Sequence, residues 1–224
     1  MGLIDGVYAI AMTLIAIELP TLISELLTLD QKNVSTEFVA WLIGYEFIAY
    51  TATFMMLYEL WTVHKSILTQ GGLTRHFQNL INGGILSLTC LGAGNIILLL
   101  KEKTGQAVTS IVANTTLAQL MHNWVNTYSF FSLANFLLIA IMYLLMSLLG
   151  STSKAHRTSK DLRHLTRSLR HRSLFFLICS TLWIPILFGG SLAFPPAILI
   201  LIFLFFNFNQ HYFSALINHL KLHR

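Results

Sequence analysis

The chain has 224 residues, of which 55% are hydrophobic and only 10% are charged, and its mean hydropathy is +0.67. These values lie outside the range of ordinary soluble proteins, so the composition excludes a soluble globular fold and predicts an integral membrane protein. The formal net charge is +5, and it comes from 14 lysines and arginines that are unevenly spread along the chain.

Six hydrophobic runs are long enough to cross a bilayer. A helix that rises about 1.5 Å per residue needs about 20 residues to span about 30 Å of hydrocarbon. The predicted spans are residues 4–29, 38–68, 77–100, 124–149, 174–191 and 194–216. We therefore expect an all-α, polytopic protein with one six-helix transmembrane domain over residues 1–224. The length of the first run favours a first span over a cleaved signal peptide.

Two segments between the predicted spans are more polar. Residues 105–123 are amphipathic, as is typical of a helix on the membrane surface. Residues 150–173 form a basic loop in which lysine, arginine or histidine recurs every three to four residues, which favours a helix near anionic lipid headgroups. This segment lacks both aromatic stacking partners and glycine-rich turns, so we expect no nucleic-acid partner.

Lysine and arginine also predict the orientation. Eleven of them fall on one set of connections and termini, whereas the alternate connections hold only Lys32, Lys101 and Lys103. Positive residues concentrate on the cytoplasmic side. We therefore expect a multi-pass protein of the cell membrane with both its N- and C-termini in the cytoplasm.

Motifs for enzymatic chemistry are missing from the sequence. It has no Walker glycine loop, no G-x-S-x-G, no H-E-x-x-H and no carboxylates paired at a useful spacing, so we expect no enzyme. The histidines His156, His164 and His171 have no cysteine or carboxylate at ligand spacing, and we expect no metal site. The T-V-G-Y-G filter of many potassium channels is also missing, which excludes that kind of channel only.

The first predicted helix carries its polar groups in an ordered way. At about 100° per residue, one face holds seven residues, aliphatic in the inner half and polar at the outer end. They are Ile10, Thr13, Leu14, Ile17, Thr21, Ser24 and Glu25. Asp5 lies about 140° from Ile10 and therefore on the opposite side. Taken alone, this pattern fits a lipid-facing, a core or a pore-lining strip.

A carboxylate in a membrane helix needs partners, because burying it unpaired is costly. Trp61 and His64 lie three residues apart in the second predicted span, on one helical face and near the same membrane depth as Asp5. Asn79 and Asn82 begin the third predicted span at a similar depth. We expect a polar network among these five residues that ties three helices together.

Three stretches together resemble bacterial members of the transmembrane protein 175 family, which are potassium channels. They are LIDGVYAIAMTLIAIEL, LWTVHKSIL and HFQNLINGGILSL. The family pattern in the first helix is Arg-x-x-x-Phe-Ser-Asp-Gly, which Asp5 and Gly6 match. Leu3 and Ile4 stand where phenylalanine and serine are usual, and the arginine position would precede Met1.

The resemblance implies a moderately potassium-selective channel of the bacterial inner (plasma) membrane, in which the first helix lines the pore. Ile10 would form the narrowest ring, with Leu14 and Ile17 beyond it and Thr13 contributing to the preference for potassium. Thr21, Ser24 and Glu25 would then line the outer mouth. Because the chain holds one six-helix repeat, the resemblance implies a homotetramer in the lipid bilayer, with potassium as the permeant ion and no cofactor. A secondary transporter and a proton-conducting channel remain as alternatives.

Overall fold

The fold is built from helices. The computed structural model describes residues 2–30, 36–112, 129–181, 184 and 199–207. Its elements are α1 (Gly2–Asp30), α2 (Thr36–Gly71), α3 (His76–Val112), α5 (Ser129–Ser151), the short 3-10 helix η1 (Lys154–Arg157) and α6 (Lys160–Thr181), and residues 199–207 are also helical. These residues contain no strand, so the predicted all-α class is confirmed for this part of the chain.

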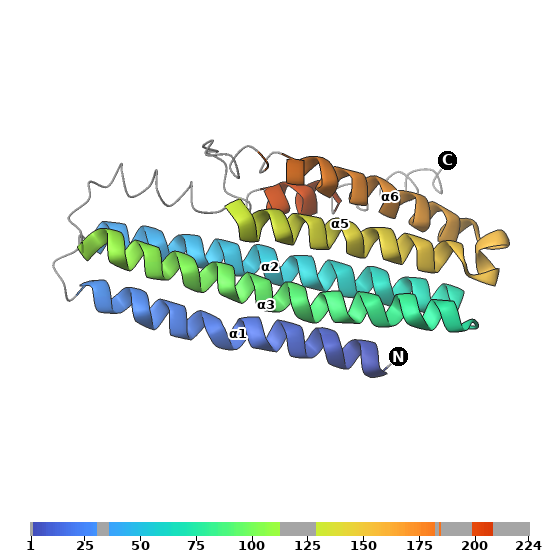
Figure 1. The fold of residues 1–224 in the computed structure, drawn as a ribbon, viewed down its shortest axis with the longest axis horizontal. Coiled ribbons are helices and arrows are strands. Elements are labelled where there is room, and N and C mark those ends of the chain that lie inside the picture. The colour runs from blue at the N-terminus through green and yellow to red at the C-terminus, as the bar shows by residue number, and fades with distance from the viewer. Residues whose placement is uncertain (1, 31–35, 113–128, 182–183, 185–198, 208–224) are drawn as a thin grey trace, which may run out of the picture.

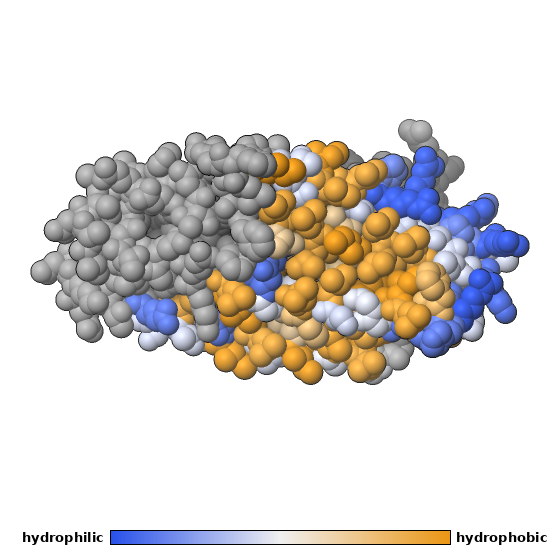
Figure 2. Space-filling view, viewed as in Figure 1, coloured by the Kyte–Doolittle hydropathy of each residue, from blue (hydrophilic) through white to orange (hydrophobic). Residues whose placement is uncertain are grey.

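The helices form an elongated bundle in which helices that follow one another along the chain run in opposite directions (Figure 1). Helix α1 lies at one edge, where it packs against α2 and α3, while α5 packs against α3 and α6. The N-terminal end of α1, the α2–α3 connection and the α5–α6 connection share one end of the bundle. Figure 2 shows hydrophilic surface gathered at this end and hydrophobic surface over the middle of the molecule.

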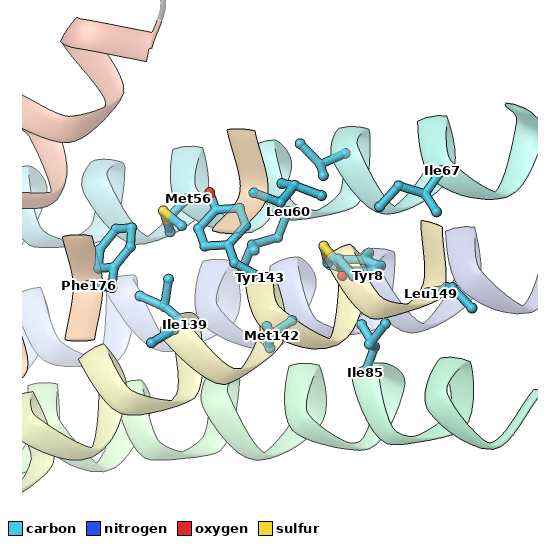
Figure 3. Packing of buried hydrophobic residues seen from close by; sticks show 14 of the residues in the cluster. Tyr8, Met56, Leu60, Ile67, Ile85, Ile139, Met142, Tyr143, Leu149 and Phe176 are labelled. Atoms are coloured by element: carbon cyan, nitrogen blue, oxygen red, sulfur yellow. The ribbon is translucent and has the colours of Figure 1, made fainter. Parts of the chain in front are cut away.

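One hydrophobic core joins five of the helices. Tyr8 of α1, Leu60 of α2, Ile85 of α3, Tyr143 of α5 and Phe176 of α6 are all buried in it (Figure 3). Lipid tails are as apolar as leucine, so membrane helices associate through close packing and interhelical hydrogen bonds more than through burial of apolar surface. The interlocking aromatic and aliphatic side chains supply this packing.

Helices α1 and α2 cover the first two predicted spans, whereas the third helix is longer than its span. Helix α3 continues from residue 100 to Val112 and so includes residues 105–112 of the segment expected on the membrane surface. No proline interrupts this stretch, so nothing in its backbone chemistry ends the helix at residue 100. The remainder of that segment, residues 113–123, lies outside the described residues.

The basic segment over residues 150–173 is mostly helical, and it is not separated from the predicted fifth span. Helix α6 begins at Lys160 and runs without a break to Thr181, into the predicted fifth span. The Ser159 hydroxyl caps its start by accepting a hydrogen bond from the Leu162 N–H at 3.2 Å, and Asp161 adds an acidic first turn. With neither glycine nor proline between residues 160 and 181, the basic and apolar parts form one helix.

Three of the described helices are long and apolar enough to cross a membrane, namely Gly2–Glu25, His76–Leu98 and Leu133–Ser151. They support the membrane class. Helix α2 is not among them, and it carries Glu46 and Glu59 within its length. Much of the fifth and sixth predicted spans lies outside the described residues, so the six-span topology stays a prediction.

Helices α5 and α6 approach each other closely near their connection. A Cβ atom added to Gly150 would lie 2.5 Å from Cγ2 of Thr166, so only glycine fits there. The Ser147 hydroxyl donates to the Thr166 carbonyl at 3.0 Å, and the Ser173 hydroxyl donates to the Ala140 carbonyl at 2.8 Å. These hydrogen bonds between helices fix the position of α6 along α5.

Candidate functional site

Helix α1 has two contrasting faces. Tyr8, Ile15 and Leu22 are buried against the bundle. On the other face, Ile10 is 61% exposed, Leu14 50% and Ile17 63%. The structure therefore places the three aliphatic residues expected to line a pore on one strip that points away from the rest of the chain. They are not part of the core of this chain.

The polar residues expected near the strip lie on the same side of α1. Thr13, Thr21, Ser24 and Glu25 are all exposed. From Ile10 to Glu25 the strip is about 22 Å long at about 1.5 Å per residue. The Thr13 hydroxyl donates to the Ala9 carbonyl at 2.7 Å, which uses its only hydrogen and leaves oxygen lone pairs that can accept hydrogen bonds or contact a cation.

Asp5 is held by α2 at the hydrophilic end of the bundle. The Trp61 indole Nε1–H donates to Asp5 Oδ1 at 2.8 Å, and the Lys65 ammonium lies 3.4 Å from the same oxygen. The Lys65 Nζ also lies 4.7 Å from the centroid of the Trp61 ring, within the range of a cation–π contact. The carboxylate thus has both a hydrogen-bond donor and an opposite charge.

A second polar contact joins three helices through His64, which is fully buried in α2. His64 Nε2 lies 2.8 Å from the Asn82 amide oxygen on α3, and His64 Nδ1 lies 3.5 Å from the Tyr8 hydroxyl on α1. If Nε2 carries the proton and donates to Asn82, Nδ1 is free to accept from the Tyr8 hydroxyl. We call these two contacts, together with the contacts of Asp5, the interhelical network.

The interhelical network differs from the expected set of residues in two ways. Asn79 lies exposed on α3 and makes no hydrogen bond to the network within the described part of the chain. Lys65 and Tyr8 belong to the network, although neither is in the set of residues expected from the sequence. Helical spacing contained the signal for both, because Lys65 follows Trp61 by four residues and Tyr8 follows Asp5 by three.

A buried ion pair that the sequence did not predict joins α6 to α2. The Arg172 guanidinium of α6 donates through Nη1 to the Glu59 carboxylate of α2, and both side chains are mostly buried. The guanidinium lies 5.9 Å from the centroid of the Tyr143 ring of α5. The two charged residues are 113 positions apart, so no local pattern predicts the pair. It anchors the basic half of α6 to the bundle.

The side chains that could bind a metal ion are dispersed over the described part of the chain. Among the residues that the structure describes, no three histidine, cysteine, aspartate or glutamate side chains gather closely enough to hold a metal ion. Cys90 is exposed and Cys179 is buried, and each is a free thiol. What the site offers is a long exposed strip on one helix and a polar network that fixes that helix in place.

These features describe a helical protein with three candidate membrane spans and an exposed aliphatic strip on its first helix. Residues 1–92 match the family model described as endosomal/lysosomal potassium channel TMEM175. This match agrees with the resemblance seen in the first three helices, and it covers less than half of the 224 residues. No curated protein and no solved structure matches the chain.

Proposed function

We propose that the protein is a moderately potassium-selective channel whose pore is lined by helix α1 from four copies of the chain. One observation carries the proposal: Ile10, Leu14 and Ile17 form an exposed aliphatic strip on a helix at the edge of the bundle. The family match supports it, because residues 1–92 include the strip and every residue of the interhelical network.

The pore would close at a ring of isoleucine side chains. Water leaves an apolar constriction that is narrow enough, and an ion cannot cross the dry region without its hydration shell, so a hydrophobic ring can gate without a plug. Ile10 occupies this position in the proposal, with Leu14 and Ile17 extending the apolar region by one and two turns. Opening would widen the ring until water re-enters it.

Selectivity would come from the ease with which an ion loses water. Potassium sheds its hydration shell more readily than sodium, so a narrow apolar constriction favours it modestly. The Thr13 oxygen is suited to replace part of the lost hydration, because its hydrogen is bonded back to the Ala9 carbonyl. Thr21, Ser24 and Glu25 would form a polar outer mouth. Selectivity of this kind is weaker than that of a carbonyl-lined filter.

The decisive experiment is the bi-ionic reversal potential of the reconstituted full-length protein in a planar bilayer, with potassium on one side and sodium on the other. We expect single-channel steps whose current is linear in voltage, and a reversal potential displaced toward that of potassium. Varying the pH on one side at fixed potassium tests proton conduction in the same recording.

Three outcomes would contradict the proposal. Saturable flux without single-channel steps would indicate a secondary transporter. A reversal potential that follows the pH gradient and ignores the potassium gradient would indicate a proton-conducting channel. An absence of current from protein that elutes as a single folded species would remove the conducting role altogether.

A further inference from the structure

We propose that a groove between α6 and residues 199–207 binds the headgroup of an anionic phospholipid. The groove has a volume of about 730 Å³. Its charged side is formed by His164, Arg167, His171 and Arg172 of α6, and its apolar side includes Phe203 and Phe206. Nothing in the proposed pore uses these residues, so the groove is a separate site.

The positive charge of the groove is not balanced within the described residues. Arg172 is paired with Glu59, which fixes its position. Arg167, His164 and His171 have no carboxylate partner in the part of the chain that the structure describes. In the sequence, Asp161 is the only acidic residue after Glu102, whereas residues 154–172 hold seven lysines and arginines. An anion from outside the chain is therefore the complementary partner.

The groove also changes character along its length, which favours an amphiphile over a free anion. His164, Arg167, His171 and Phe175 follow one stripe of α6, with successive members three or four residues apart. The stripe passes from basic to aromatic over eleven residues, or about 16 Å. Phe203, from residues 199–207, stacks on Phe175 at its aromatic end with ring centroids 5.4 Å apart. A phosphate would meet the basic part and an acyl chain the aromatic part.

The position of the groove in the bundle fits the same ligand. Helix α6 starts at the hydrophilic end of the molecule and runs toward its hydrophobic middle (Figures 1 and 2). Basic pockets between membrane helices near the headgroup level are known to hold anionic lipid headgroups. Because Glu59 and Arg172 join this wall of the groove to α2, a bound lipid would contact the same bundle that positions α1.

The test is lipid binding by the purified full-length protein, measured by native mass spectrometry with phosphatidylglycerol, phosphatidylcholine and inorganic phosphate as probes. We expect phosphatidylglycerol to bind about tenfold more tightly than phosphatidylcholine, and Arg167→Gln to weaken that binding by about fivefold, as the loss of one charge near the headgroup level predicts. Arg163→Gln is the matched control. It removes the same charge from an exposed position of α6 outside the groove, and binding should change less than about twofold.

Each other outcome overturns the proposal. Equal losses in Arg163→Gln and Arg167→Gln would show that the helix attracts anionic lipid through its overall charge and not through the groove. Competition by inorganic phosphate as strong as that by phosphatidylglycerol would show an anion site without an acyl chain. Equal binding of the two lipids would remove the charge selectivity. Both variants alter exposed side chains, and unchanged thermal unfolding establishes that they are folded.

Discussion

At the scale of single residues, the question is what the Ile10 side chain contacts. It is 61% exposed on a helix at the edge of the bundle, and lipid, water or another copy of the chain can cover such a surface. Ile178 of α6 is equally exposed, at 64%, and also aliphatic. Exposure alone therefore does not distinguish a pore residue from a lipid-facing one. The same substitution made at Ile10 and at Ile178 distinguishes the two cases.

We expect Ile10→Ser to raise the single-channel conductance or the leak current and to weaken discrimination against sodium, because a hydroxyl keeps water in the constriction. Ile178→Ser should leave both properties within error of the parent protein. The measurement is the unitary current and the bi-ionic reversal potential in planar bilayers. Equal effects of the two substitutions, or no effect of either, would contradict a role for Ile10 in the pore.

Residue identities predicted part of the polar network and not all of it. Asp5 requires a partner in an apolar helix, and Trp61 and His64 stood out as polar groups near the same end of the second span. Lys65 is the partner of Asp5 with opposite charge. In the sequence it is one of eleven basic residues that indicate the orientation of the protein in the membrane. Asn79 and Asn82 are indistinguishable by composition, and only the helix rotation decides that Asn82 reaches His64.

At the scale of elements, the interhelical network fixes α1 against α2 and α3. Two of its contacts with α1 start from residues 5 and 8, one turn apart, and reach residues of α2 that are each 56 positions further along the chain. Contacts so spaced set both the rotation and the axial position of α1. The rotation matters for the proposed function, because it determines which face of α1 carries the exposed strip.

The hydrogen bond between His64 and Asn82 should contribute measurably to the stability of the bundle. Interhelical hydrogen bonds in membrane proteins are worth about 0.6 to 2 kcal/mol. We expect a double-mutant cycle of His64→Ala and Asn82→Ala, followed by reversible unfolding in mixed micelles, to give a coupling free energy in this range. Asn79→Ala is the control, since Asn79 is exposed and does not contact His64, and its effect should add to that of His64→Ala. Additive effects of His64→Ala and Asn82→Ala would show that the bond contributes no net stability.

Helix α6 illustrates how an element combines two roles. Its first half carries the charges of the groove and its second half packs Phe176 into the core. Ser147 and Ser173 hold it along α5, and Arg172 joins it to α2. A separate loop and span would leave the basic residues free to move relative to the membrane. A continuous helix holds each of them at a fixed position relative to the bundle.

At the scale of the whole molecule, the position of α1 determines how copies of the chain can assemble. The strip faces outward at the edge of the bundle, so several copies can bring their strips together without rearranging the fold. Helix α6 lies on the far side of the bundle from α1 (Figure 1). Rings of identical subunits with closed cyclic symmetry are the common form of such assemblies.

We expect the purified protein to have the mass of a tetramer, four times 25.3 kDa, when the detergent contribution is subtracted in light scattering. Introducing Ile17→Cys in a background that also carries Cys90→Ala should allow oxidation to cross-link neighbouring copies, because in the proposed channel four strips meet at a common axis. Leu174→Cys, at an exposed position of α6, is the control and should not cross-link. A monomeric mass, or equal cross-linking at both positions, would contradict the proposed assembly.

The sequence by itself determined the membrane class, the helical content and the grouping of residues on each face of α1. These properties depend on hydrophobicity summed over about 20 residues and on a helical period of about 3.6, both of which are local. Only the tertiary structure decided which polar side chains meet. It also decided that the basic segment and the start of the predicted fifth span form one helix packed on the bundle. The groove between basic residues of α6 and the side chains of Phe203 and Phe206 is likewise a tertiary feature. Those contacts join residues tens of positions apart, and the choice among partners of similar chemistry depends on the rotation and offset of whole helices, which no local pattern contains.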